Sequence, residues 1–248
     1  MRVSSHVHLV ASGAAGFSLT DALDCNTWLI ETGDGLAMFD TGAGRDVGAL
    51  VAEVQAGGLD PAQLRHIFLT HAHADHSGGA AALLERAPSR ITLHAGREAA
   101  ARMESDDETR ISLDRARRLG VYPSDYRWRG AVVGNVIKDD EIVRIGDATI
   151  RLLETPGHSD DQCPFLVQIQ DKTLLISGDA VFAGGKVILQ DIPDCSVSAT
   201  LDSIRRLAAL QFETFLPGHG AFAVRDGRRH VVRGSEYADT GLAPPSFF

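Results

Sequence analysis

The chain has 248 residues, of which 44% are hydrophobic and 23% are charged. This composition is typical of a folded globular protein and excludes a disordered chain, a collagen-like chain and a disulfide scaffold. The formal net charge of -9 provides no positive field for a phosphate backbone. We therefore expect no nucleic-acid partner and look instead for a small-molecule substrate.

The cysteines and the start of the chain indicate the compartment. Cys25, Cys163 and Cys195 are far apart and odd in number, which argues against a disulfide framework and fits a reducing environment. The first 17 residues contain His6 and His8 where a secretory signal needs an apolar core. No stretch approaches the roughly 20 apolar residues that cross a bilayer. A cytoplasmic protein without membrane association is expected.

Short apolar runs alternate with helical patterns along the whole chain. In the first half, strands are predicted at 27–30, 36–39, 66–69 and 91–94, with helices at 46–55, 79–85 and 97–104. In the second half, strands are predicted at 141–145, 149–154, 165–169, 173–177 and 214–216, with a helix at 197–210 and a polar tail. This alternation predicts an α/β protein with one domain over residues 1–248.

The segment 105–130 interrupts the pattern, because many charges surround Tyr122, Tyr126 and Trp128 there. We interpret it as a helical insertion. Placed between the two α/β halves, it is expected to cover the active site, with these aromatic side chains contacting substrate and Arg118 or Arg127 facing an acidic group. The alternative is a surface helix or a contact between copies of the chain in a homo-oligomer.

A cluster of potential metal ligands follows the apolar strand 66–69. His71, His73, Asp75 and His76 all fall within six residues. Imidazole nitrogen and carboxylate oxygen suit zinc, manganese and iron, and a tight loop after a rigid strand turns such side chains in different directions. The spacing does not match a zinc finger, so a closed structural site is the weaker interpretation.

Three later positions repeat this setting. His158, Asp179 and His219 each follow an apolar strand and each has a neighbouring glycine, which lets the backbone turn sharply. The remaining histidines lack this setting and are expected to be surface or packing residues; they are His6, His8, His66, His94 and His230.

The HxHxDH loop, the later TPGH, the GD pair and the final PGHG resemble, in that order, the metallo-β-lactamase-fold hydrolases. The resemblance implies an αββα sandwich of two mixed sheets flanked by helices. It also implies three histidines on one metal, a second metal held by three further ligands, and a bridging aspartate. The first metal would be held by His71, His73 and His158, and the second by Asp75, His76 and His219. The bridging aspartate would be Asp179.

Asp40 and Asp179 refine the resemblance. Asp40 matches a DTG turn of the family, where it would orient a ligand, although an aspartate that caps its own turn is an equal alternative. A bridging aspartate such as Asp179 is similar to that of glyoxalase II, lactonases and ribonuclease Z, and argues against antibiotic hydrolysis. Asp161 departs from the family, which commonly has glycine there. The acidic charge argues against ribonuclease Z.

The resemblance implies a dinuclear hydrolase of a small ester, thioester or lactone, in which a metal-bridging hydroxide attacks the carbonyl carbon. Asp75 is a ligand in this scheme and a candidate proton acceptor. Two divalent ions are expected, zinc first, with iron or manganese as alternatives. The alternatives in function are a mononuclear iron oxygenase on the same fold and a non-catalytic metal-binding module.

Overall fold

The computed structural model describes residues 1–87 and 91–247. Its first sheet has the strand order β1-β2-β3-β4-β5-β6. The strands are β1 (Val7–Ala11), β2 (Thr27–Thr32), β3 (Gly35–Phe39), β4 (Leu64–Leu69), β5 (Thr92–Gly96) and β6 (Asn135–Ile137). The pairs β1·β2 and β2·β3 are antiparallel, and the other three pairs are parallel.

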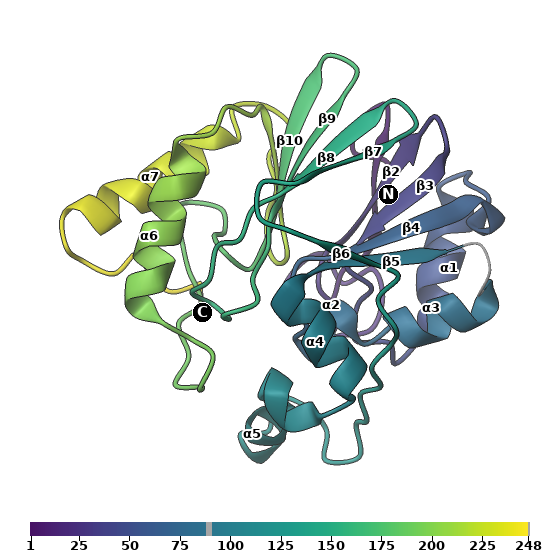
Figure 1. Cartoon of the computed structure of the whole chain (residues 1–248), viewed down its shortest axis with the longest axis horizontal. Helices are drawn as coiled ribbons and strands as arrows, with labels where there is room; N and C mark the ends of the chain where they lie inside the picture. Colours follow the sequence, from purple (N-terminus) through teal and green to yellow (C-terminus); the bar gives the residue numbers. More distant parts are fainter. Residues whose placement is uncertain (88–90, 248) are drawn as a thin grey trace.

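The second sheet has the order β11-β10-β9-β8-β7. Its strands are β7 (Ile142–Ile145), β8 (Ala148–Leu152), β9 (Phe165–Ile169), β10 (Lys172–Gly178) and β11 (Thr214–Pro217). Only the pair β10·β11 is parallel. Both sheets are therefore mixed, and they face each other between helices (Figure 1).

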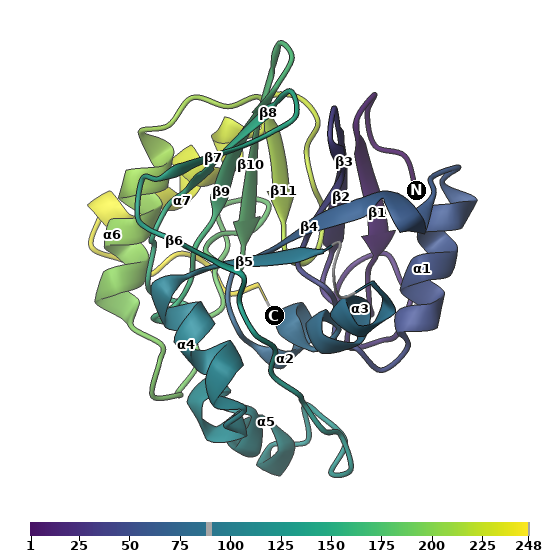
Figure 2. The same cartoon turned by 45° about the vertical axis from the view of Figure 1, so that its right-hand side comes forward.

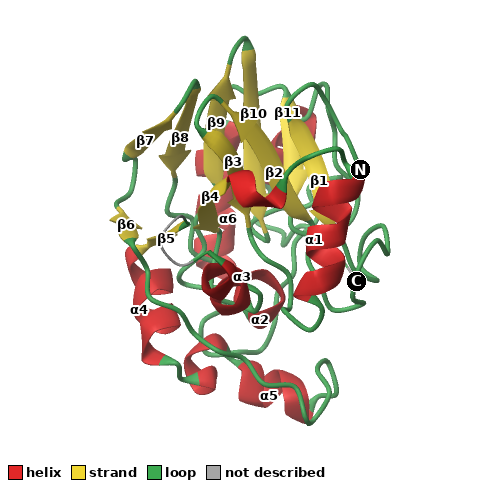
Figure 3. Cartoon of the chain, turned by 90° about the vertical axis from the view of Figure 1, so that its right-hand side faces the viewer, coloured by secondary structure: helices red, strands yellow, loops and turns green. Residues whose placement is uncertain are grey.

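Helices cover the outer faces of both sheets, as Figures 2 and 3 show. On the side of the first sheet lie α1 (Val47–Ala56), α2 (Ala74–Ser77), α3 (Ala80–Arg86), α4 (Arg97–Ser105) and α5 (Leu113–Arg118). On the side of the second lie α6 (Val197–Ala208) and α7 (Arg228–Asp239). The predicted αββα sandwich is confirmed. Among the described residues, no helix is long and apolar enough to span a bilayer.

The space between the sheets is filled by large apolar side chains. Phe39 stacks on Phe68 with ring centroids 5.0 Å apart, and Phe165 packs edge-on against both. Each fully buried side chain of this size stabilises the fold by about 1.5–3 kcal/mol. The preceding residue of β4, Ile67, faces the helices instead. Burial on both faces explains why the sequence shows continuous apolar runs there.

The prediction of a polar tail is wrong, because Arg228–Asp239 forms helix α7. Its buried residues are Val231, Gly234 and Ala238, which are spaced at helical intervals but include little apolar surface. They pack against α6 and Gly185. So small a buried face is not recognisable in the sequence, because it can be identified only when the partner helix α6 is known. The short strands β1 and β6 were also not predicted.

The insertion 105–130 is helical only in part. A 3-10 turn at Glu108–Ile111 and helix α5 are followed by turns and irregular chain. Tyr126 donates a hydrogen bond to the carbonyl of Ala43 at 2.8 Å, and Trp128 Nε1 donates to Ser77 Oγ at 2.8 Å. The aromatic residues therefore fix this segment to the loops beneath it.

His94 makes stability depend on pH. Its ring stacks on Phe68 with centroids 4.3 Å apart, and its Nδ1 accepts a hydrogen bond from Asn135 Nδ2 at 3.0 Å. Burial and the neighbouring His66 lower the pKa of His94 to about 3. The unfolded chain protonates this imidazole more readily than the folded protein does. The stabilisation that neutral His94 gives the fold is therefore complete above the unfolded pKa of about 6.5 and is lost as pH falls toward 3.

The unaltered protein should therefore lose free energy of unfolding when the pH falls from 7 to 5. We expect His94→Gln to lose about 2 kcal/mol less over the same pH range. Urea denaturation at the two pH values measures this difference. His6→Gln, at a half-buried histidine near the start of the chain, serves as the matched control. Equal losses in all three proteins would contradict the assignment to His94.

Candidate metal centre

The HxHxDH loop connects β4 to α2 across the end of the first sheet. Asp161 Oδ2 accepts a hydrogen bond from the backbone of Ala72 at 2.8 Å, and Ser77 Oγ donates to the carbonyl of Ala72 at 2.8 Å. Helix α2 then begins at Ala74. This geometry turns His71 and His73 toward the second sheet while Asp75 and His76 follow on the first turn of the helix.

The second sheet supplies the other three side chains at the same end of the molecule. His158 lies in the loop between β8 and β9, Asp179 follows β10 directly, and His219 follows β11. Because β10 and β11 are parallel neighbours, their carboxyl ends meet at one edge. Seven residues that are up to 148 positions apart in the sequence thus reach one place.

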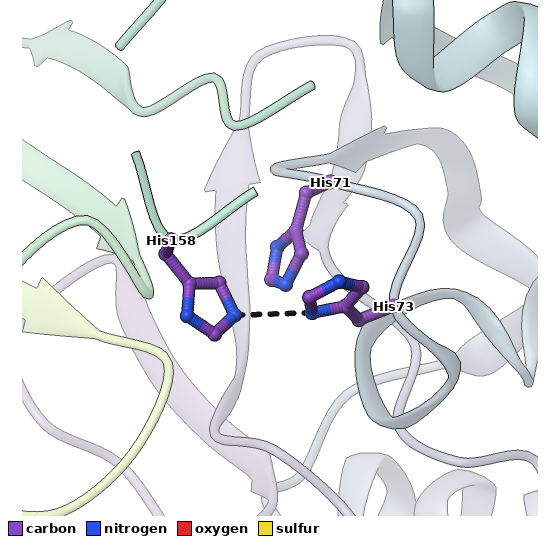
Figure 4. Close-up of side chains that lie close together, drawn as sticks. All are labelled: His71, His73 and His158. Atoms are coloured by element: carbon purple, nitrogen blue, oxygen red, sulfur yellow. Dashed lines mark hydrogen bonds between the residues drawn. The ribbon is translucent and has the colours of Figure 1, made fainter. Parts of the chain in front are cut away.

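Three histidines form the first cluster. The ligand atoms of His71, His73 and His158 all lie within 4.8 Å of one another. Figure 4 shows the three rings turned toward a common point, His71 and His73 from the loop after β4 and His158 from another loop, with His73 Nδ1 and His158 Nε2 only 3.0 Å apart. About 3.3 Å separates two nitrogens around a tetrahedral zinc, so this spacing suits a cation.

Asp75, His76 and His219 form the second cluster, also within 4.8 Å. Asp75 Oδ2 lies 3.1 Å from His219 Nε2 and 3.6 Å from His76 Nε2. Asp179 lies between the two clusters. Its Oδ1 is 3.2 Å from His76 Nε2, and its Oδ2 is 3.6 Å from His158 Nε2. Asp179 therefore contacts a member of each cluster.

Unsatisfied polar atoms show that these residues suit a cation. His71 Nε2, His76 Nε2 and Asp179 Oδ1 are buried and have no hydrogen-bond partner. Leaving such an atom unpaired costs about 1–3 kcal/mol, and more for a charged group. The three atoms belong to one cluster in which all ligand atoms lie within 4.8 Å. A bound cation would satisfy all three.

The orientation of three imidazole rings is fixed by contacts at the ring nitrogen that faces away from the centre. His71 Nδ1 contacts Thr70 Oγ1 at 3.1 Å, and His158 Nδ1 lies 3.3 Å from the carbonyl of Ile188. Asp40 Oδ2 lies 2.8 Å from His76 Nδ1. The structure thus places Asp40 against a ligand candidate. His71 Nε2 and His76 Nε2, which face the centre, have no hydrogen-bond partner and are available to a metal.

Sequence reasoning missed Asp194, which lies 3.0 Å from His73 Nε2. Asp194 comes from the loop between β10 and α6 and also accepts hydrogen bonds from Arg102 and Ser112. No motif surrounds it in the sequence. Only the fold brings it beside the HxHxDH loop, so no local signal could have found it.

Two glycines permit this crowding. Gly178 has φ +50°, and a Cβ there would lie 2.6 Å from Thr70 Oγ1. A Cβ on Gly218 would lie 2.6 Å from His76 Cε1. Because any side chain would push the HxHxDH loop away, the glycines beside Asp179 and His219 allow the two sheets to meet at the centre.

The pKa values of the candidate ligands shift in both directions: burial lowers those of His71 and His158, whereas acidic neighbours outweigh burial and raise those of His73, His76 and His219. Burial lowers the pKa of His158 to about 4, so its imidazole is neutral at pH 7. Burial opposes the ionisation of Asp179, but His219 and His76 outweigh it and hold the pKa of that carboxyl well below its usual range. Neutral imidazoles and ionised carboxylates are the forms that coordinate cations.

A cavity of about 590 Å³ opens over the centre. The candidate ligands His73, Asp75, His158, Asp179 and His219 line it. Much of the remaining lining is apolar and includes Leu23, Ile111, Leu113, Leu119, Val121, Ile188 and Ile192. The insertion 105–130 supplies several of these residues, so it borders the cavity as the sequence predicts.

The individual contacts of the insertion differ from the prediction. Among the predicted aromatic residues, only Tyr122 lines the cavity, while Tyr126 and Trp128 are buried behind it by their hydrogen bonds to Ala43 and Ser77. Arg118 pairs with Asp114, and Arg127 donates to backbone carbonyls. Arg115 lies at the wall instead.

The model of the metallo-beta-lactamase superfamily matches residues 20–219 of this chain. The chain belongs to the metallo-beta-lactamase superfamily. The match includes all seven residues that converge at the centre, and it confirms the family that the sequence motifs indicate. The clusters of histidines and aspartates that could hold a metal ion lie within the matched region.

Relatives within the superfamily include fungal proteins. The lactamase-like protein vrtG of Penicillium aethiopicum is 31% identical over 201 residues, which cover 79% of this chain and 51% of that protein. The atrochrysone carboxyl ACP thioesterase of Aspergillus fumigatus is 26% identical over 202 residues, covering 81% of this chain and 38% of that protein. The chain thus spans about half or less of the length of these relatives.

Solved structures of the superfamily share the fold. The metallo-beta-lactamase GOB-18 of Elizabethkingia meningoseptica superposes with a TM-score of 0.73 at 16% identity, covering 97% of this chain and 89% of that one. At this identity the likeness establishes the αββα architecture alone.

Proposed function

We propose that this superfamily member is a dinuclear metal-dependent hydrolase of a small acyl thioester. The observation that carries the proposal is the convergence of two ligand clusters on Asp179, which contacts both. His71, His73 and His158 would hold one cation, and Asp75, His76 and His219 the other. The thioesterase among the relatives supports the choice of a thioester over an oxygen ester or lactone.

When bound, two divalent cations lower the pKa of water and polarise a carbonyl oxygen. The residues of the chain supply the rest. The apolar wall of the cavity, with Leu113 and Val121, fits an acyl group and excludes bulk water from it. Asp75 is the candidate proton acceptor, because its side chain is 22% exposed whereas that of Asp179 is only 4% exposed.

The leaving group also favours a thioester. A thiol has a pKa of about 8.5 and departs readily as a thiolate near neutral pH. It therefore places little demand on a general acid beside the leaving group. Addition of water to the acyl carbon then yields a carboxylic acid and a free thiol.

Metal removal tests the proposal. We expect natively purified protein to contain two divalent ions per chain, zinc first, and to hydrolyse an acyl thioester faster than the matched oxygen ester, lactone or β-lactam. Dialysis against a chelator should abolish turnover, and added Zn²⁺, Mn²⁺ or Fe²⁺ should restore it. Elemental analysis measures the metal content, and release of carboxylic acid measures turnover of all four substrates, with release of free thiol as a second readout for the thioester.

Other results would contradict the proposal in distinct ways. One iron per chain with oxygen consumption would indicate an oxygenase, and bound metal without turnover of any substrate would indicate a binding module. Fastest turnover of the β-lactam would overturn the choice of thioester. Undiminished turnover by the metal-free protein would overturn the metal-dependent mechanism itself.

A further inference from the structure

We propose that the insertion 105–130 is part of the metal centre and positions one ligand in each cluster. Tyr122 acts on Asp75, and Ser112 acts on His73 through Asp194. The inference rests on the proposed function, because it takes Asp75 and His73 as ligands of two cations. Tyr122 and Ser112 are positioning residues in this account.

The contact with the second cluster is direct. The hydroxyl of Tyr122 donates a hydrogen bond to Asp75 Oδ1 at 2.9 Å. The other oxygen, Asp75 Oδ2, faces His219 and His76. Because Tyr122 holds Asp75 Oδ1, Asp75 Oδ2 is directed toward the proposed cation site. Without this hydrogen bond, the carboxylate is free to rotate and to present either oxygen.

Tyr122 is itself held in place. Its side chain is 8% exposed, and its ring packs on that of Tyr126 with centroids 5.0 Å apart. Tyr126 is anchored to the carbonyl of Ala43 on the loop after β3. The hydroxyl that reaches Asp75 therefore belongs to a rigid pair of rings, as the positioning of a ligand requires.

The contact with the first cluster passes through one residue. Ser112 Oγ donates a hydrogen bond to Asp194 Oδ1 at 2.7 Å, and Asp194 Oδ2 lies 3.0 Å from His73 Nε2. Ser112 stands between the 3-10 turn and α5, with φ +55°. Ser112 thus holds Asp194 Oδ1, the oxygen that does not contact His73. This hydrogen bond sets the direction of the Asp194 carboxylate, which in turn orients the imidazole of His73.

The two contacts start from points ten residues apart on the insertion and end in different clusters. Between them, Leu113, Ala116 and Leu119 line the cavity. Figures 1 and 2 place α4 and α5 at the edge of the sheets where β10 ends. One segment thus forms part of the cavity wall and orients ligands on both sides of Asp179.

Stepwise metal binding tests the inference without reliance on activity. The metal-free full chain is titrated with Co²⁺, followed by visible absorption, and with Zn²⁺, followed by calorimetry. Loss of such an outer hydrogen bond typically weakens metal affinity about 10- to 100-fold. We expect Tyr122→Phe to weaken one binding step by this factor, Ser112→Ala to weaken the other, and the double variant to weaken both. The Co²⁺ spectrum should change in each case.

Two matched variants control for packing. Tyr237→Phe removes a tyrosine hydroxyl on α7, outside the insertion, and Ser124→Ala alters an exposed serine within it. Both should bind two cations like the unaltered chain. Unchanged affinities and spectra in Tyr122→Phe and Ser112→Ala, or equal losses in the controls, would overturn the inference alone. An unaltered chain that binds fewer than two cations would overturn the proposed function and this inference together.

Discussion

Asp179→Asn is expected to lower turnover of the best thioester by about two to three orders of magnitude, which is the usual effect of removing one preorganised electrostatic group from an active site. The amide keeps the size of the side chain but not its charge. Asp179 contacts His76 with one oxygen and His158 and His219 with the other. Loss of the charge therefore weakens both proposed cation sites together.

Steady-state kinetics and elemental analysis on the same sample measure this prediction. Metal content should fall below two ions per chain, while the circular dichroism spectrum stays unchanged because the sheet around β10 is intact. Asp171→Asn, at an exposed turn before β10, is the matched control and should behave like the unaltered protein. Full activity with two bound ions in Asp179→Asn would show that Asp179 does not bridge.

Arg102→Leu is expected to lower the free energy of unfolding by about 3–5 kcal/mol at pH 7, because removal of one partner leaves buried charges uncompensated. Arg102 is 6% exposed and pairs with Asp160, Asp161 and Asp194. The side chains of Asp161 and Asp194 are 0% and 5% exposed. Without the guanidinium, two buried carboxylates would face each other across the loop that holds His73.

The deficit should shrink at pH 5. In the variant, Arg102 no longer helps to hold down the pKa of the Asp194 carboxyl, so this group takes up a proton at a higher pH than in the folded unaltered protein, and the difference in stability narrows as pH falls. Urea denaturation of both proteins at pH 7 and pH 5 measures the change. Arg118→Leu, at an exposed pair with Asp114, should cost less than about 0.5 kcal/mol. A similarly small cost for Arg102→Leu would contradict the prediction.

The family and the residues of the centre were evident from the sequence, because each lies in a short motif beside an apolar strand. His71, His73, Asp75 and His76 share one loop, so their proximity needs no tertiary information. Most strands other than β1 and β6 were also predictable, since strands such as β4 and β10 contain continuous apolar runs. Helix α7 was not predictable, because its few buried residues can be recognised only from their packing against α6.

The local sequence determined which residues are candidate metal ligands, and the tertiary structure decided which side chains hold those candidates in place. Asp194 and Arg102 belong to no motif and come from distant segments, yet they meet at His73 and Asp161. The aromatic residues of the insertion were visible in the sequence, but only the fold shows that Tyr122 reaches Asp75 while Tyr126 and Trp128 point into the protein. A side chain's direction depends on contacts between segments far apart in the chain, and a single sequence contains no local signal for those contacts.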